Sequence, residues 1–412
     1  MNQKLTKLEK RWILYDVGNS AFVLLTSTII PIYYKNIASA SGISDSDSTA
    51  FFGYATSLVT ILVAVLGPVL GTLADTKGFK KPVFTFFMMM GVLGCAGLAL
   101  PATWVAFLAV YVLAKTGLNA SLVFYDAMLP DVTTDERMDV VSAQGYAWGY
   151  IGSCIPFIVS LVFVLCSDMI GISGGTAMAA AFLLNAAWWF LVTLPLLKSY
   201  EQKHYVERTP HPVRDSFGRL AKVFSEVRQN PAIWFFLLAF FFYIDGVYTI
   251  IDMATSYGKD VGISDTNLLL ALLLTQVVAF PCSILVGHLS KKLRNTTLIQ
   301  ISIGGSFCIV LFAPQLDKAR EFWFLAVCVA VSQGAIQSLS RSYFARIVPK
   351  EKSTEFFGFF DIFGKGAAFM GTMLMGISTQ LFDTSRAGVA LLAVMFAIGF
   401  VLFRMAVRKV EA

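Results

Sequence analysis

The sequence predicts an all-α membrane protein with twelve transmembrane helices in two similar six-helix bundles and both termini in the cytoplasm. Three observations predict it. The chain is 57% hydrophobic and 14% charged, whereas soluble domains are about 25% charged. Its apolar runs form twelve segments, each close to the length of about 20 residues that a spanning helix needs. A pattern of residues also recurs about halfway along the 412 positions.

The recurring pattern consists of residues that shape the backbone. Its first copy is Pro130, Glu136, Gly145 and Gly152, and its second copy, 219 positions later, is Pro349, Glu355, Gly364 and Gly371. A further pair, Gly71-Thr-Leu-Ala and Gly287-His-Leu-Ser, lies 216 positions apart. Duplicated membrane halves are typical of solute carriers, which bind their substrate where the halves meet. The alternative is coincidence between two apolar segments.

The predicted spans are bounded by charge, glycine and proline. In chain order they cover residues 12–37, 51–74, 82–100, 102–130, 140–166, 175–197, 232–256, 266–290, 295–313, 322–347, 355–380 and 386–407. The first span follows a basic segment, as a signal peptide would. No small-residue cleavage site closes it, so we interpret it as a retained span.

Lysine and arginine predict the orientation. Of 32 such residues, 24 fall on the side of both termini, whereas the opposite loops hold four, Lys259, Lys318, Arg320 and Arg386. Basic loops stay in the cytoplasm, so both termini are expected there. The longest polar stretch separates six spans from six. We therefore expect an N-terminal bundle at 1–197, a cytoplasmic linker at 198–231 and a C-terminal bundle at 232–412.

Polar side chains recur on single faces of several predicted spans. Residues four or seven apart share a helix face, and a charge at the bilayer centre costs at least about 2.5–3.5 kcal/mol. These residues are Asp16 and Asn19 in the first span, Lys115, Asn119 and Asp126 in the fourth, Asp245 and Asp252 in the seventh, Gln333, Gln337 and Arg341 in the tenth, and Asp361 and Lys365 in the eleventh. We expect spans 1, 4, 7 and 10 to line a water-filled cavity where such groups meet.

In that cavity the charged groups would bind substrate. Lys115 and Arg341 would hold an anionic group, because a guanidinium pairs bidentately with carboxylate or phosphate. Asp245 lies about 20 Å into its helix. It would meet a substrate amine, or take up a proton when the cavity dries, since desolvation favours the neutral carboxyl. Gln337 is the fourth main contact. Secondary contacts are expected from Asn19, Asn119, Gln333, Asp252 and Tyr125.

Simpler roles remain open for some of these residues. Asp361 and Lys365, four positions apart, would form a helix-stabilising ion pair near the cytoplasmic interface. Asp16 and Asp126 lie near helix ends and would anchor loops. Asp245 would be neutralised by one of the intramembrane cations.

The loop after the second span carries a compact motif of glycine and charge. It comprises Gly71, Asp75, Gly78, Lys80 and Lys81. Glycine permits close helix approach and a tight turn, and Asp75 can cap or face a helix N-terminus. We expect this motif to control a cytoplasmic gate; a plain basic loop is the alternative.

In this position the motif resembles the major facilitator superfamily pattern Gly-x-Leu-Ala-Asp-Arg-x-Gly-Arg-Lys, with Thr76 and Phe79 at two arginine positions. Over nearly the whole chain, other motifs resemble the vacuole-effluxer-like branch, the autophagy-related amino-acid effluxers, in a compact bacterial-type form. They are Tyr15-Asp16-Val-Gly-Asn19, Phe124-Tyr125-Asp126, Gly145-Tyr146-Ala-Trp-Gly149, Tyr243-Ile-Asp245-Gly246 and Gln337-Ser-Leu-Ser-Arg341-Ser-Tyr343. The resemblance implies a twelve-helix carrier whose eukaryotic relatives export amino acids from the vacuole.

We therefore expect a monomeric secondary carrier in a bacterial plasma membrane. It would move a small polar solute, an amino acid or a related zwitterion or anion, by alternating access, with protons as the candidate coupling ion. No metal site is expected, because the six cysteines lack CxxC spacing, and ATP is not expected as the direct energy source, because no Walker pattern occurs. No cofactor, catalytic residue or nucleic-acid partner is expected either, and the net charge of +6 is interpreted as a signal of topology. The alternatives are a carrier of amphipathic lipids or drugs, a non-transporting receptor on a carrier fold, and a lipid-modifying membrane enzyme.

Overall fold

The computed structural model describes residues 4–100, 103–207, 224–260, 262–316, 318–382 and 385–411. Apart from an isolated bridge between Thr76 and Val206, the regular structure in these ranges is helical. The α-helices are α1 Lys7–Ser27, α2 Ile29–Ala40, α3 Asp45–Ala74, α4 Lys80–Gly97, α5 Trp104–Asp126, α6 Leu129–Val132, α7 Met138–Leu165, α8 Ser167–Ile170, α9 Gly174–Ser199, α11 Pro231–Asp260, α12 Asp265–Leu289, α13 Asn295–Phe312, α14 Ala319–Ile347, α15 Ser353–Phe382 and α16 Ser385–Glu411. The 3-10 turns are η1 Ala313–Gln315 and η2 Lys350–Lys352.

Nine of the described helices are long and apolar enough to cross a membrane, and there are ten such spans if α1 and α2 count as one. The nine are α3, α5, α7, α9, α11, α12, α13, α14 and α16. Helices α4 and α15 coincide with two further predicted spans. The all-helical class is confirmed, whereas the number twelve stays a prediction.

The first predicted span, 12–37, is not one straight helix. Helices α1 and α2 meet at a bend of 40°. Pro31 has no N–H to donate to the Ser27 carbonyl, and the Thr28 hydroxyl donates to the Leu24 carbonyl at 2.5 Å. Both features weaken the backbone hydrogen bonding that would keep the helix continuous.

Several helices begin at capping residues that the sequence supplies. The Thr6 hydroxyl accepts the Glu9 amide while the Glu9 carboxylate accepts the Thr6 amide, which forms a capping box at the start of α1. Ser44 and Ser173 accept amides at the starts of α3 and α9. Gly42, just after α2, has a φ of 80°, a conformation that glycine adopts without strain.

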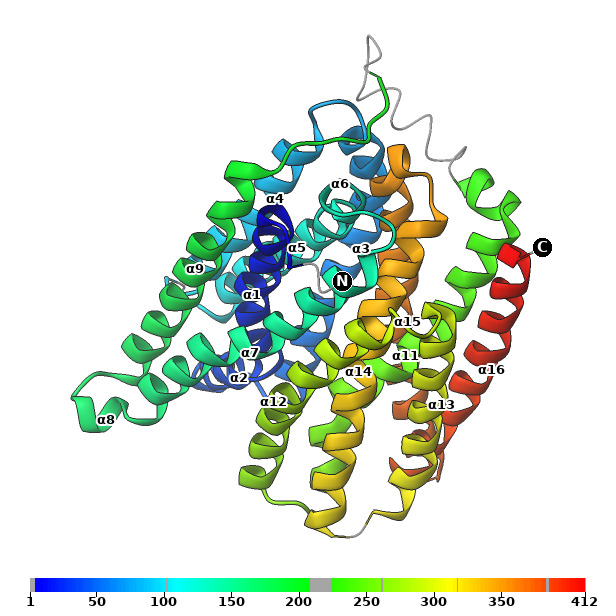
Figure 1. Cartoon of the computed structure of the whole chain (residues 1–412). Coiled ribbons are helices and arrows are strands. Elements are labelled where there is room, and N and C mark those ends of the chain that lie inside the picture. The colour runs from blue at the N-terminus through cyan, green and yellow to red at the C-terminus, as the bar shows by residue number, and fades with distance from the viewer. Residues whose placement is uncertain are drawn as a thin grey trace.

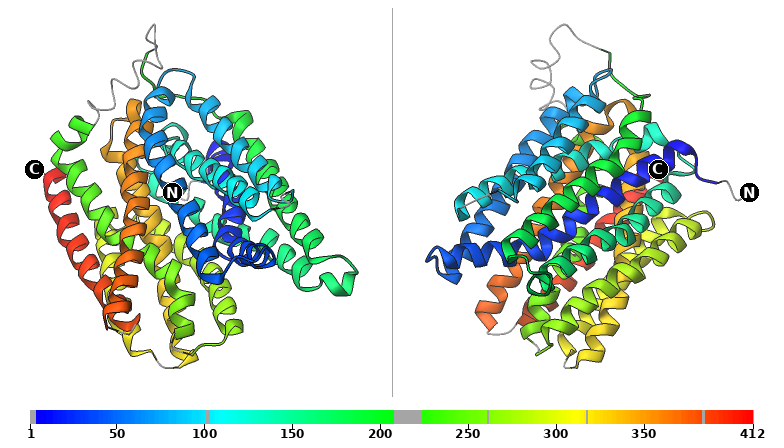
Figure 2. Two further views of the ribbon diagram at one scale, coloured as in Figure 1. Left: turned by 180° about the vertical axis from the view of Figure 1, so that it is seen from behind. Right: turned by 90° about the vertical axis from the view of Figure 1, so that its left-hand side faces the viewer.

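The helices pack as two groups that approach each other on one side. In the first group α1 packs on α7 and α9, and α4 packs on α5 and α9; in the second, α11 packs on α15 and α16, and α14 packs on α12 and α13. Helix α3 contacts α15, and α7 contacts both α12 and α14. Figures 1 and 2 show the two groups close together near residues 200–207 and spread apart at their other ends. We call the end where residues 200–207 leave α9 the linker side.

The repeat in the sequence appears in the structure as repeated contacts. Between α1 and α5, the hydroxyl oxygens of Tyr15 and Ser121 are 2.6 Å apart. Between α11 and α14, those of Tyr243 and Ser340 are 2.7 Å apart. The two tyrosines lie 228 positions apart and the two serines 219. The two groups of helices therefore use equivalent residues for the same contact.

Two glycines of the repeat extend this equivalence. A Cβ atom on Gly152 of α7 would meet the side chain of Val17 on α1. A Cβ atom on Gly371 of α15 would meet the carboxylate of Asp245 on α11. Val17 and Asp245 also lie 228 positions apart. One helix interface thus holds a valine where its equivalent holds an aspartate.

Candidate functional site

A polar cluster centred on Arg341 joins α14 to helices of the first group. Arg341 Nη1 donates to Asp126 Oδ1 at 2.9 Å, and both terminal nitrogens reach Asp16 Oδ2 at 3.4 Å. Arg341 Nε donates to the Ser142 hydroxyl at 2.9 Å, and Nη2 donates to the Ser142 carbonyl at 3.0 Å. These contacts use all five N–H groups of the guanidinium. In this conformation Arg341 binds protein groups rather than the anionic substrate that the sequence suggested.

Aromatic side chains surround the same guanidinium. Its central carbon lies 4.3 Å from the ring centroid of Tyr146, 4.8 Å from that of Trp12 and 5.7 Å from that of Tyr125. Cation–π contacts of this kind contribute about 0.5–2 kcal/mol each. The Tyr125 hydroxyl donates to Asp16 Oδ2 at 2.8 Å. Asp16 is therefore a partner of the cluster, and its alternative role as a loop anchor is wrong.

The other predicted cations have separate partners. Lys115 donates to the Thr26 hydroxyl on α1 at 2.7 Å. Lys365 donates to the backbone carbonyl of Asn119 at 3.4 Å and lies 2.5 Å from Asp361 in an ion pair. The simple interpretation of Asp361 and Lys365 as a pair four residues apart matches the structure.

Asp245 is wholly buried, and among the described residues it has no ion-pair partner. Its Oδ1 accepts the Gly371 amide at 2.9 Å and the Thr249 hydroxyl at 3.4 Å. Its Oδ2 has no hydrogen-bond partner in the described part of the chain. The alternative in which a cation neutralises Asp245 is therefore not what the described residues show. The side chain of Asp252 lies outside the described residues.

The predicted amide contacts are also spread over several helices. Gln337 accepts the Tyr150 hydroxyl of α7 at 2.7 Å. The Asn19 amide donates within its own helix to the Tyr15 carbonyl at 2.7 Å. Together with the separate partners of the charged residues, these contacts show that the polar faces of spans 1, 4, 7 and 10 do not meet in one shared chamber. That expectation is wrong for this conformation, because some of these side chains contact the opposite group of helices, as Gln337 does, whereas others bond within their own group, as Asn19 does.

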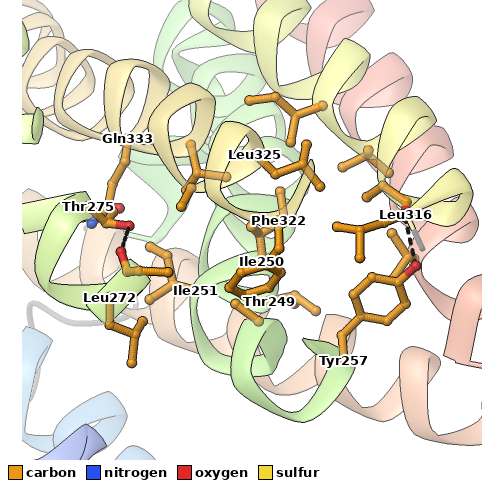
Figure 3. Close-up of a pocket in the computed structure, with 18 of the residues that line it drawn as sticks. Thr249, Ile250, Ile251, Tyr257, Leu272, Thr275, Leu316, Phe322, Leu325 and Gln333 are labelled. Carbon is orange, nitrogen blue, oxygen red and sulfur yellow. Dashed lines mark hydrogen bonds between the residues drawn. The ribbon is translucent and has the colours of Figure 1, made fainter. Parts of the chain in front are cut away.

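A pocket of about 110 Å³ lies instead within the second group of helices, α11–α16 (Figure 3). Gln333 and Thr275 lie at one end, and Tyr257 and Leu316 at the other. Most of the wall is apolar. Thr249, the residue that donates to Asp245, is part of this wall. Gln333 is thus the one predicted substrate contact among the pocket-lining residues.

The loop after α3 joins the first group of helices to the start of α15 on the linker side. Asp75 Oδ1 accepts the Thr354 amide at 3.0 Å and Oδ2 accepts the Glu355 amide at 2.8 Å, which caps the start of α15. Lys80 is wholly buried, donates to the Ser353 hydroxyl at 2.9 Å and lies 3.7 Å from Asp75. Burial raises the pKa of Asp75 above its ordinary value, despite the opposing effects of Lys80 and the two amides.

The remaining residues of the motif divide between α15 and the linker. A Cβ atom on Gly71 would lie 2.8 Å from the Thr354 carbonyl oxygen, so this glycine lets α3 and α15 touch. Gly78 has a φ of 80° and donates its amide to Gln202 at 3.0 Å. Lys81 donates to the Tyr200 carbonyl at 3.4 Å. The motif therefore holds the first residues of the linker as well as the second group of helices.

Asp131 is a residue of this region that the sequence analysis missed. It accepts the Tyr200 hydroxyl at 2.5 Å, the His204 amide at 2.9 Å and Lys80 Nζ at 3.4 Å. Burial acts to raise the pKa of Asp131, but Lys80 and the hydrogen bonds from His204 and Tyr200 together hold it below its ordinary value. Its position directly after Pro130 of the repeat was the available signal.

Asp139, in the first turn of α7, was missed as well. It accepts the Asn295 side-chain amide and the Ser342 hydroxyl, each at 2.5 Å, and lies 2.7 Å from Arg346 in an ion pair. A Cβ atom on Gly287 of α12 would approach Ala143, which lies on α7 like Asp139. Gly287 is the repeat partner of Gly71, so each group of helices presents a glycine to the other on the linker side.

Comparison with known proteins decides the family. A family model described as vacuole effluxer Atg22 like matches residues 6–410. The chain belongs to this family. Among Atg22-like relatives, an uncharacterized MFS-type transporter of Bacillus subtilis strain 168, YxiO, is 44% identical over 98% of this chain and 95% of the relative. Autophagy-related protein 22 of Saccharomyces cerevisiae strain YJM789 is 26% identical over 90% of this chain and 86% of its own.

A solved structure supports the same fold. The major facilitator superfamily transporter FucP, in the outward conformation, is similar with a TM-score of 0.73 at 14% identity, over 97% of each chain. The Atg22-like family and the 44% identical MFS-type relative make this protein a multi-pass membrane transporter rather than an enzyme, and the likeness to FucP shows the major facilitator fold.

Proposed function

We propose that this protein is a secondary active transporter in a bacterial plasma membrane that moves a small amino acid or related zwitterion by alternating access. In this proposal twelve spans form bundles at residues 1–197 and 232–412, joined by a linker at 198–231, with both termini cytoplasmic. The contacts between the groups of helices on the linker side support it. They would be the closed cytoplasmic gate, which opens when the bundles rock.

The observation that carries the proposal is the buried carboxylate of Asp245. Its equivalent, Val17, packs against the equivalent glycine without charge, so helix packing does not require an acid at this place. A charge inside the membrane is costly and is typical of a functional site. The Asp245 Oδ2 atom, which has no hydrogen-bond partner among the described residues, would accept a hydrogen bond from a substrate ammonium group or take up a proton.

The pocket beside Thr249 supports a substrate with an apolar part. Asp245 would bind the cationic group, Gln333 would donate or accept a hydrogen bond, and the apolar wall would hold the remainder. Lys115 and Arg341 would contact the carboxylate only after the linker side opens, because Arg341 must first leave Asp16 and Asp126.

Transport into liposomes tests the role of Asp245. Purified protein is first screened by thermal shift against amino acids, peptides, sugars and lysolipids, because a ligand of the folded state raises its stability. The best ligand is then followed into liposomes across a pH gradient. Asp245→Asn is expected to bind weakly or lose gradient-driven uptake. Full gradient-driven uptake by this variant would contradict the assigned role.

An amphipathic lipid or drug is the second candidate substrate, and the apolar wall of the pocket favours it. The same screen separates the candidates, since stabilisation by lysolipids without stabilisation by amino acids would select the amphipathic class. Solute counterflow in liposomes separates both from a non-transporting receptor, which would bind ligand without flux.

A further inference from the structure

The Arg341 cluster contains more carboxylates than cations. Asp16 and Asp126 both contact this one guanidinium, and the side chains of Arg341, Asp16 and Asp126 are 2%, 10% and 18% exposed. A buried ion pair is balanced when each charge has a partner, and an uncompensated buried charge is strongly unfavourable. With both acids ionised, the cluster would carry one excess negative charge.

The neighbouring helices do not supply the missing positive charge. On α15, Lys365 is paired with Asp361 at 2.5 Å, so these two groups balance each other. The cluster's other contacts from α1, α5 and α7 are neutral: the rings of Trp12, Tyr125 and Tyr146 and the hydroxyl and carbonyl of Ser142. The described groups around Arg341 therefore sum to one negative charge.

We propose that the cluster binds one proton in this conformation, held on Asp126, and releases it when the linker side opens. Asp16 Oδ2 already accepts hydrogen bonds from the Tyr125 hydroxyl and from both terminal nitrogens of Arg341. Asp126 accepts one hydrogen bond, from Arg341 Nη1, and its side chain is the more exposed of the two acids. The two acids titrate as a coupled pair, and Asp126 is the site that holds the proton in this conformation and exchanges it with water.

The proton balance follows from the movement of α14. On closure, one Asp126 carboxylate oxygen gains a proton from water as Arg341 arrives and water leaves. On opening, Arg341 departs with α14, both carboxylates are hydrated, and the proton returns to water on the linker side. This inference rests on the alternating access proposed above, and it places a proton site away from Asp245.

The proton site can be tested without a known substrate by measuring the equilibrium between the closed and open linker side at different pH values. Spin labels at positions 198 and 409, in a background without native cysteines, report the separation between exposed ends of α9 and α16 in liposomes. If closure takes up one proton, the closed-to-open ratio rises up to about tenfold for each unit by which the pH falls. Asp126→Asn is expected to give the same ratio at pH 5.5 and pH 8.

Two further variants extend the test: a second substitution in the cluster and a control substitution outside it. Asp16→Asn should also abolish the pH response, because it too leaves one carboxylate for one guanidinium. Asp135→Asn should retain the response, since Asp135 pairs one-to-one with Lys350 at 2.8 Å across the same interface.

The inference is overturned if the unsubstituted protein shows no pH response, or if Asp126→Asn and Asp16→Asn retain it. It is also overturned if Asp245→Asn abolishes the response, since the proton would then belong to Asp245, and the proposed transport function would stand. Loss of uptake in Asp245→Asn with an unchanged pH response would support both proposals.

Discussion

Val17 and Asp245 occupy equivalent positions in the two groups of helices, and the difference between them separates what packing requires from what function requires. Each side chain faces a glycine of the repeat, Gly152 or Gly371. The valine fills this place with apolar atoms alone. The aspartate brings a buried oxygen without a partner in the described part of the chain.

We therefore predict that Asp245→Val folds as well as the unsubstituted protein and transports poorly. Its melting temperature in detergent should be equal or higher, because the cost of burying the carboxylate is removed. Uptake of the identified substrate should fall at least about tenfold. A variant that unfolds at a clearly lower temperature would show that the carboxylate has a structural role.

Arg341 and its two acids, Asp16 and Asp126, should stabilise the protein jointly. Removing one side of a buried charge cluster leaves the other side uncompensated. Arg341→Gln is therefore expected to destabilise strongly, and its combination with the double change Asp16→Asn and Asp126→Asn should cost less than the sum of the two separate changes, by about 0.5–3 kcal/mol. The free energy of unfolding in detergent, measured for each variant, gives this difference. Additive effects would mean that Arg341 does not interact with the two acids.

The charged residues could be found from the sequence, but their partners could not. A charge in an apolar run is visible by itself, as with Asp245 and Arg341. Arg341 and Asp16 are 325 positions apart, and no periodicity connects residues on different helices. The predicted chamber followed from treating each stripe as facing water, whereas α7 and α14 pack directly on each other.

At the element scale, the contact between α3 and α15 depends on Gly71. A methyl group there would meet the Thr354 and Glu355 backbone, which cannot rotate away. We predict that Gly71→Ala separates these helices on the linker side and weakens the amide contacts of Asp75. The spin-label distances described above should shift toward the open population.

A second glycine on α3 supplies the control. A methyl group on Gly53 would have no neighbouring atom within 4 Å, so Gly53→Ala should leave the distances unchanged. An equal effect of both substitutions would mean that helix propensity, about 0.5–1 kcal/mol, outweighs the steric contact.

Asp131 connects Lys80, at the start of α4, to Tyr200 and His204, which follow α9, and its effect on stability should depend on pH. The pKa of Asp131 is held below the ordinary value in the folded protein, so its stabilisation is complete above that ordinary value and is lost as the pH falls through the folded pKa. Asp131→Asn should therefore lower the melting temperature at pH 7 and pH 5. The difference should shrink below about pH 4. A constant difference would exclude the ionised carboxylate as the cause.

Helix ends were more predictable than helix bends. Asp75 follows a span and precedes a tight turn, and it caps α15 as its chemistry allows. The break between α1 and α2 was missed because Thr28 and Pro31 lie inside a continuous apolar run. Hydrophobic periodicity predicts one helix from such a run, whereas Pro31 and the Thr28 hydroxyl together weaken the backbone hydrogen bonding that would keep it continuous.

At the scale of the whole molecule, composition and the repeat were sufficient for the fold class. Apolar runs predict membrane helices because lipid requires every backbone group to be paired within the segment. The repeat predicts two similar halves, and the Tyr15–Ser121 and Tyr243–Ser340 contacts reproduce it. The conformation could not be predicted, because under the proposed alternating access one sequence must fit both an open and a closed linker side.

In the proposed mechanism the linker side must open for solute to pass. Asp135 and Lys350, paired across the two groups of helices at 2.8 Å, can be replaced by cysteines in a background without native cysteines and joined by a short reducible bifunctional reagent. Counterflow of the identified solute in liposomes should stop in the joined protein and return after reduction. Unchanged counterflow while the two sides remain joined would contradict alternating access.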